Sequence, residues 1–152
     1  MNMHKKILAL TLAALLGAAA LPATATPGKL GSGKTASATK NRIVIQINED
    51  NSKKWHEVLV NIKNIQAELG PKNVAIALVA IGPGLGMLTA ESLAANGVQD
   101  ALAAGVEFVA CGNSMKAQKV TKDDLVEGVS VNVAGYVELV QRQQQGWAYL
   151  RP

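Results

Sequence analysis

Cysteine, histidine and aromatic residues are scarce in this chain of 152 residues. The one cysteine, Cys111, cannot form an intramolecular disulfide, and together with two histidines it falls short of the four ligands of a typical zinc site. One Phe, two Trp and two Tyr do not provide a platform on which nucleic acid bases could stack. We therefore expect no intramolecular disulfide, no bound metal and no nucleic acid partner.

Positive charge is concentrated before residue 41, so the formal net charge of +4 is not spread evenly along the chain. Five lysines precede residue 41, whereas residues 41–152 contain ten basic and eleven acidic residues, a net charge of −1. A domain that binds nucleic acid electrostatically carries an excess of basic residues. Residues 41–152 have no such excess, which again argues against nucleic acid binding.

The first 25 residues have the pattern of a secretory signal peptide. Lys5 and Lys6 precede a mainly apolar run over residues 7–21, and Ala23 and Ala25 supply the small side chains of a cleavage site. The apolar run is short for a transmembrane helix. We expect cleavage after Ala25, a periplasmic or secreted mature protein, and no membrane association after cleavage.

Residues 26–40 are rich in glycine, serine, threonine and lysine, which indicates a flexible linker. Within them, residues 28–35 match the spacing of a phosphate-binding P-loop. That loop works between a strand and a helix, but here a cleavage site precedes it and no helical pattern follows. We expect no nucleotide site there. Flavin or nucleotide binding elsewhere would rest on analogy between folds alone, so no cofactor is predicted.

Residues 41–152 alternate between strand and helix patterns, which predicts one small α/β domain. Apolar or β-branched runs predict strands at residues 42–48, 73–80, 106–111 and 129–133. Helical patterns occur at residues 55–69 and 136–143, with one or two short helices at 89–104 and a helix start at 121–124. Right-handed crossovers would place the strands in a mostly parallel four- to five-stranded sheet with helices on both faces.

The loops that follow the strands of a parallel sheet emerge at one edge, where ligands usually bind. The predicted order brings four such loops together, at residues 48–51, 82–86, 111–114 and 134–135. Cys111 lies among them, at the end of the third strand. The candidate binding residues beside it are Asn48, Gly82, Gly84, Gly112, Asn113 and Ser114.

Cys111 is the one candidate reactive group, and its sequence context leaves three interpretations open. It is a buried inert residue, a partner in a disulfide between chains, or a thiol that is used chemically. Backbone N–H groups around Gly112 and Asn113 would favour the thiolate. His56 has polar neighbours near the start of the first helix, so we expect it on the surface and not in a Cys–His pair.

Four segments of the chain resemble the DsrE/DsrF-like family. They are residues 42–47, 61–65, 105–114 and 138–152, and the combination of the third, which contains Cys111, with the C-terminal segment is the most specific. The resemblance covers residues 41–152. It implies an α/β fold, assembly as a homotrimer or hexamer, and a link to sulfur metabolism, with sulfur carried as a persulfide on the cysteine that Cys111 matches.

Two features depart from the family pattern. The loop after the second strand commonly contains Ala-His-Gly in similar members, whereas this chain has Ala80, Ile81 and Gly82. No histidine is therefore present there for an acid/base step. The predicted signal peptide also contrasts with the sulfur-relay members, which work in the cytoplasm.

The sequence supports two hypotheses of different kinds. In the first, an exported oligomeric protein handles sulfane sulfur or thiols, with Cys111 as the nucleophile and sulfur carrier between a donor and an acceptor protein. In the second, the protein is a non-catalytic module for small-ligand binding or assembly, and Cys111 is only packed in the core. Under either hypothesis we expect residues 147–150 at or near a subunit contact.

Overall fold

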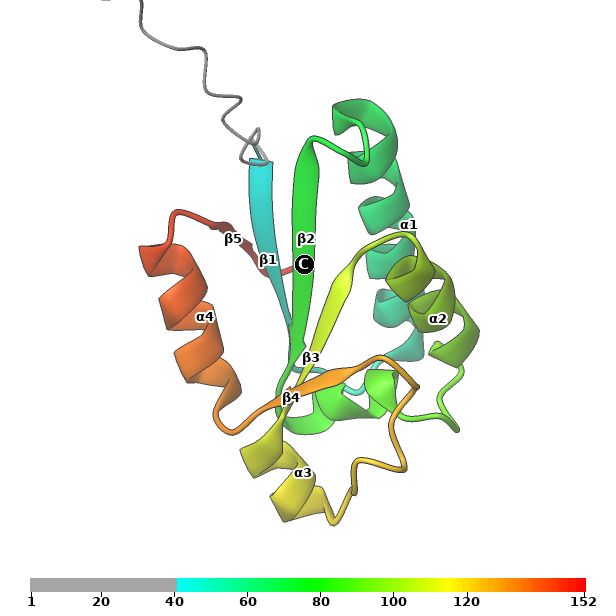
Figure 1. Ribbon diagram of the computed structural model, residues 1–152. Coiled ribbons are helices and arrows are strands. Elements are labelled where there is room, and N and C mark those ends of the chain that lie inside the picture. Colours follow the sequence, from blue (N-terminus) through cyan, green and yellow to red (C-terminus); the bar gives the residue numbers. More distant parts are fainter. Residues whose placement is uncertain (1–40) are drawn as a thin grey trace, which may run out of the picture. The chain divides into compact units, whose positions relative to one another are not determined.

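The computed structural model describes residues 41–152, and the expected signal peptide (1–25) and linker (26–40) lie outside the described residues. Ten elements follow one another along this part of the chain (Figure 1). They are β1 (Asn41–Ile47), α1 (Ser52–Leu69), β2 (Val74–Ala80), the 3₁₀ helix η1 (Gly82–Leu88), α2 (Ala95–Ala103), β3 (Glu107–Cys111), α3 (Gly112–Gln118), β4 (Ser130–Asn132), α4 (Gly135–Gln144) and β5 (Ala148–Leu150). None of the helices in this region is both long enough and apolar enough to span a bilayer.

The five strands form one sheet in the order β4-β3-β2-β1-β5, and every pair of neighbours is parallel. The central strand β2 is buried along almost its whole length, as expected for a parallel strand that is covered on both faces. The prediction of a small α/β domain with a parallel sheet is therefore confirmed.

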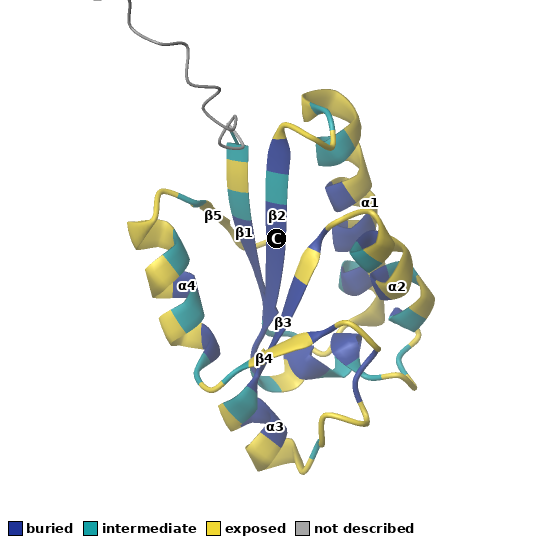
Figure 2. Cartoon of the chain, viewed as in Figure 1, coloured by how far each residue is buried: buried dark blue, intermediate teal, exposed yellow. Residues whose placement is uncertain are grey.

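Helices cover both faces of the sheet, but unequally (Figures 1 and 2). On one face, α1 and α2 pack against a large apolar core that includes Ile76, Leu78 and Phe108. On the other face, α4 contacts β1, β2 and β3 and places Leu139 in a smaller core with Val79 and Cys111. Cys111 thus belongs to the face that a single helix covers.

The first helix shows how local signals set the element boundaries. The Asn51 side chain caps α1 by accepting a hydrogen bond from the Lys54 N–H at 3.1 Å. Gly70 ends the helix with φ +83°, a conformation that glycine adopts without steric cost. The Trp55 indole donates to the Glu49 carbonyl oxygen at 2.8 Å, which fixes the start of α1 to the end of β1.

The C-terminal strand β5 was not predicted. It lies beside β1, with Ile43 opposite Ala148 and Ile45 opposite Leu150. The Tyr149 hydroxyl donates to the Gln46 Oε1 at 2.6 Å, which gives a buried amide a partner. This segment, expected near a subunit contact, therefore forms the edge of the sheet.

Three local predictions were wrong. The segment at 121–124 is a turn and not a helix start, because the backbone of Asp124 and Val126 bonds to that of Ala90 and Leu88 and does not continue into a helix. The expected loop at 82–86 is the helix η1, with Pro83 in its first turn. Residues 89–94 are not helical, and Thr89 instead forms an isolated antiparallel bridge with Leu125.

Candidate functional site

Cys111 lies at the carboxyl edge of the sheet, between the ends of two neighbouring strands. It is the last residue of β3, and α3 starts at the next residue. The sheet order places β2 on one side of β3 and β4 on the other, so the segments after both strands approach Cys111. An edge of this kind is the usual ligand-binding position of a parallel α/β sheet.

A pocket of about 380 Å³ opens at this edge. It is lined by Ile81, Gly82, Cys111, Asn113, Ser114, Ala117, Gln118, Ala134, Gly135 and Tyr136. Three of the four predicted loops contribute to it, namely those after β2, β3 and β4. Four of the seven candidate residues from the sequence, Cys111, Gly82, Asn113 and Ser114, line the pocket.

The other three candidates, Asn48, Gly84 and Gly112, do not line the pocket. A Cβ at Gly84 would stand 2.5 Å from the Ile47 carbonyl oxygen and 2.8 Å from the Asn48 nitrogen, so Gly84 lets η1 pass close to the end of β1. A Cβ at Gly112 would lie 3.2 Å from the Val133 Cα. In this structure the two glycines allow close packing of the backbone.

The Cys111 sulfur accepts a hydrogen bond from the backbone at the start of α4. Only 4% of the residue is exposed, and the Gly135 N–H donates to Sγ at 3.3 Å. Burial is the largest influence and raises the pKa of the thiol, but donors together outweigh it. The lowering influences come from the Ser114 hydroxyl and the nearby backbone N–H groups of Gly135, Ser114 and Asn113, and together they bring the pKa of Cys111 below its ordinary value.

Two side chains of α3 hold the loop after β2. The Ser114 Oγ accepts a hydrogen bond from the Gly82 N–H at 2.7 Å, and the Gln118 Nε2 donates to the Gly82 carbonyl oxygen at 2.7 Å. Ser114 and Gln118 are four residues apart and therefore share one face of the helix. Because a hydroxyl can accept and donate at the same time, Ser114 can accept from Gly82 and still lower the pKa of the neighbouring Cys111 thiol.

Sequence reasoning missed Ala117, Gln118 and Tyr136 as pocket residues. A helix predicted directly after Cys111 would have placed Gln118 on the same face as Ser114. Tyr136 is 60% exposed at the first turn of α4. It forms part of the pocket wall without being buried in it.

Histidine and metal ligands do not form part of this site. Ile81 is 6% exposed and lines the pocket in the position where similar family members commonly have histidine. His56 is exposed on α1 and is not among the pocket residues. Within residues 41–152 no three His, Cys, Asp or Glu side chains cluster as a metal site would require. The site can therefore offer a thiolate, hydroxyl and amide donors, and an apolar wall.

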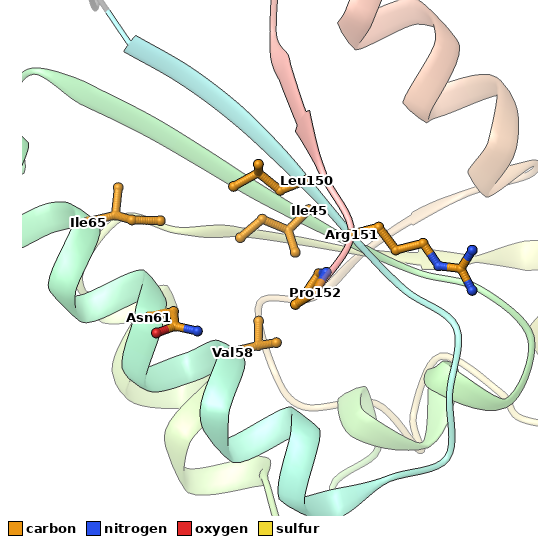
Figure 3. A pocket seen from close by; sticks show the side chains of 7 residues that line it. All are labelled: Ile45, Val58, Asn61, Ile65, Leu150, Arg151 and Pro152. Carbon is orange, nitrogen blue, oxygen red and sulfur yellow. The ribbon is translucent and has the colours of Figure 1, made fainter.

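A second hollow of about 190 Å³ lies between α1 and the C-terminal segment (Figure 3). Its lining consists of Ile45, Val58, Asn61, Ile65, Leu150, Arg151 and Pro152. Most of these side chains are aliphatic, and none is a nucleophile. Since this hollow contains no reactive group, the Cys111 pocket is the candidate functional site.

The fold and the pocket define a class of protein, a small parallel α/β domain with a thiol at the ligand-binding edge. The sequence profile of the DsrE/DsrF-like family matches residues 35–152. The chain belongs to this family, and the resemblance noted in the sequence is confirmed. No curated protein sequence matches the chain.

Solved structures agree with this assignment. A protein of unknown function from Methanobacterium thermoautotrophicum, MTH1491, is 37% identical over 74% of this chain and 99% of its own, with a TM-score of 0.71. The conserved protein of unknown function BT1422 from Bacteroides thetaiotaomicron is 15% identical, with a TM-score of 0.64 over 77% of this chain and 99% of its own. The ychN protein from E. coli is 14% identical, with a TM-score of 0.61 over 74% of this chain and 99% of its own. The last two show similarity of fold alone.

Proposed function

We propose that this protein accepts and passes on sulfane sulfur through Cys111, as a persulfide carrier. Membership of the DsrE/DsrF-like family fits a sulfur-relay role at the level of the family. The observation that carries the proposal is the hydrogen bond from the Gly135 N–H to the Cys111 Sγ at 3.3 Å, together with the neighbouring groups that lower the pKa of the thiol. The thiolate is the nucleophilic form of cysteine, and these donors favour it.

The proposed loading step needs no additional oxidant. The Cys111 thiolate attacks a sulfane sulfur atom of a polysulfide, and a new S–S bond forms while an S–S bond of the polysulfide breaks. The shortened polysulfide leaves with the electron pair of the broken bond. In the transfer step, the thiolate of an acceptor attacks the outer sulfur of the persulfide, and Cys111 leaves as a thiolate.

The pocket supplies what this chemistry requires. The Ser114 hydroxyl and the neighbouring N–H groups can stabilise the negative charge, which is on the Cys111 sulfur before loading and mainly on the outer sulfur afterwards. Ile81 and Ala117 add apolar surface to the same pocket, and polarisable sulfur atoms pack well against such surface. A volume of about 380 Å³ leaves room for several sulfur atoms or for the end of an acceptor side chain.

The test is intact mass spectrometry after incubation with polysulfide or thiosulfate. Because Cys111 is the only cysteine, a gain that dithiothreitol removes, at about 32 Da per sulfur atom, reports a persulfide at that residue. Cys111→Ser is the matched control and should gain nothing. A wild-type protein that gains no sulfur, and whose thiol resists alkylation until unfolding, would overturn the proposal.

One observation favours a second candidate function, that of a small-ligand-binding or assembly module. Cys111 is 4% exposed and belongs to the smaller apolar core, as a purely structural cysteine would. Under this alternative the thiol of the folded protein is protected from iodoacetamide, and Cys111→Ser leaves the function unchanged. The rate of alkylation therefore distinguishes the two functions.

Self-association is also proposed, as a homotrimer or hexamer. The outward face of α4 carries no charge, and its exposed residues are Tyr136, Val137, Val140, Gln141, Gln143 and Gln144. The charged side chains of this helix, Glu138 and Arg142, instead turn inward and pair with each other. An uncharged, partly apolar helix face supports a subunit contact. Light scattering after size exclusion would measure the mass, and a monomer would contradict this proposal.

Export to the periplasm or beyond is proposed from the pattern of residues 1–25 alone. The expected product is a mature chain that starts at Thr26. N-terminal sequencing of the protein from cell fractions would test both the cleavage site and the compartment. Recovery of the uncleaved chain in the cytoplasm would contradict the proposal.

A further inference from the structure

A chain of charged and polar side chains from β3, β4 and α4 supports the connection between β4 and α4. The Arg142 guanidinium donates to Glu107 Oε2 at 2.7 Å and to Glu138 Oε1 at 2.6 Å. The other oxygen of Glu138 accepts from the Asn132 Nδ2 at 2.7 Å. The Asn132 Oδ1 then accepts from the Ala134 N–H at 3.1 Å.

The middle of this chain is shielded from water. The side chains of Arg142 and Glu138 are 12% and 15% exposed, and the Arg142 guanidinium lies 4.4 Å from the centre of the Trp147 ring. Burial tends to lower the pKa of Arg142, but hydrogen bonds to Glu107 and Glu138 hold it above its ordinary value, so the guanidinium keeps its charge. Charge-assisted hydrogen bonds in such surroundings fix geometry more firmly than neutral bonds at a wet surface.

The far end of the chain is attached to the backbone that contacts the thiol. Asn132 lies beside Cys111 in the register of β3 and β4, and its side chain bonds to the backbone two residues ahead, as in an Asx turn. The Val133 carbonyl oxygen, within that turn, accepts from the Asn113 N–H at 3.0 Å. The next residue after the turn is Gly135, whose N–H donates to the Cys111 Sγ.

We infer that Asn132 is a positioning residue, which holds the turn at 132–134 so that the Gly135 N–H stays directed at the Cys111 sulfur. Glu138, which Arg142 holds in place, orients the Asn132 amide through its hydrogen bond to Nδ2. This inference deepens the proposed function and rests on it for its biological meaning, since it concerns how readily the same thiol reacts. It also means that the ion pairs of Arg142 with Glu107 and Glu138 influence the reactivity of Cys111 without contacting it.

The test measures the rate of iodoacetamide alkylation of Cys111 as a function of pH in the full chain. In Asn132→Ala, we expect the midpoint of the pH profile to move upward, with about a threefold to tenfold lower rate at neutral pH, as for a pKa rise of about half a unit to one unit. The rate at the alkaline plateau should not fall, because there the thiol is ionised in both proteins and a thiolate of higher pKa is at least as nucleophilic. A variant that had only become more open or less stable would not show this combination.

Two further variants complete the experiment. In Asn132→Ser, the hydroxyl can form the same bond two residues ahead, though more weakly, so its midpoint should lie between those of wild type and Asn132→Ala. Asn73→Ala is the matched control, because Asn73 also bonds a backbone group, the Leu69 carbonyl oxygen, but lies directly before β2 and is not a pocket residue. This control should lose some stability and keep the wild-type midpoint.

The outcomes separate this inference from the proposed function. A wild-type midpoint that is depressed, with no shift in Asn132→Ser or Asn132→Ala, would overturn the positioning role and leave the proposed function intact. A wild-type midpoint at the ordinary thiol value would contradict both the positioning role and the proposed function, because both require a stabilised thiolate. If Asn132→Ala does not fold, Asn132→Ser alone decides, because an unshifted midpoint in that variant would also overturn the inference.

Discussion

Gly135 lies directly against Cys111. Its N–H donates to the Cys111 Sγ over 3.3 Å, and a Cβ at Gly135 would stand 3.0 Å from the Cys111 Cβ and 2.8 Å from the Ile81 Cγ1. The backbone can therefore reach the sulfur only because position 135 has no side chain. The identity of this residue thus affects both the packing and the chemistry of the thiol.

Gly135→Ala should damage the site even though alanine favours helices. Better helix propensity contributes up to about 1 kcal/mol, whereas overpacking against Ile81 and Cys111 costs about 1–3 kcal/mol, so we expect a net loss of stability. The displaced N–H should also slow alkylation of Cys111 at neutral pH. Urea denaturation and alkylation kinetics would measure these effects. Gly97→Ala, where the added methyl meets only the flexible end of Leu59, is the control, and equal behaviour of the two variants would contradict the prediction.

Ser114→Ala should raise the pKa of Cys111 and leave the Gly82 N–H without its acceptor. An unsatisfied backbone group of this kind costs about 1–3 kcal/mol. We therefore expect lower stability together with slower alkylation at neutral pH. Ser92→Ala is the matched control, since the Ser92 Oγ also accepts from a backbone N–H, that of Ala94, away from the pocket. Thiol kinetics that are unchanged in Ser114→Ala would show that its hydroxyl does not act on the sulfur.

The stability of the folded chain should depend on the ionisation of Cys111. Because the folded protein holds the pKa of the thiol below its ordinary value, the thiolate stabilises the fold relative to the unfolded chain. This contribution is lost as the pH falls through the folded pKa, and it is fully present above the unfolded thiol pKa of about 8.5. The free energy of unfolding of wild type minus that of Cys111→Ser should thus rise with pH across this window. Urea denaturation under reducing conditions would measure it, and a falling difference would contradict the assignment.

Removal of Arg142 should cost far more stability than removal of an exposed lysine. Arg142→Gln leaves the mostly buried Glu138 without its cation, and we expect a loss of about 1–3 kcal/mol, below the full cost of breaking a deeply buried pair. The control is Lys63→Gln, whose pair with Asp100 spans 3.8 Å between two exposed side chains and should matter by less than about 0.5 kcal/mol. Chemical denaturation of both variants provides the comparison. Similar losses of stability in the two variants would show that the inward-facing ion pair of α4 stabilises the fold no more than an exposed pair does.

The parallel sheet could be predicted because its inner strands are buried on both faces and therefore consist almost entirely of apolar residues. A strand such as β2 then appears as a continuous apolar run, which differs from the patterns of α1 and α4. The position of Cys111 at the carboxyl edge followed from this alternation of elements, as did its proximity to Gly82 and Ser114. The strand β5 escaped prediction because three exposed residues do not form such a run, and its pairing with β1 is a long-range contact.

The remaining errors involve short elements whose state depends on tertiary contacts. Asp124 binds back to Thr121 in a turn, although the same residues resemble the acidic first turn of a helix. The close approach of Gly84 to the end of β1 was also outside the reach of the sequence, because it is a contact between segments far apart in the chain. Asn132 gave no sequence signal at all, since its importance comes from Glu138 and from the adjacent strand.

The location of β5 beside β1 also affects how the chain reaches its folded state. Ile43, near the start of the domain, pairs with Ala148, near its C-terminal end. During synthesis one edge of β1 therefore stays unpaired until residues 148–150 have left the ribosome. Contacts between such distant residues slow folding, and an unpaired strand edge is open to association with other chains in the meantime. The nascent protein therefore has a vulnerable interval that ends only when its last strand is added.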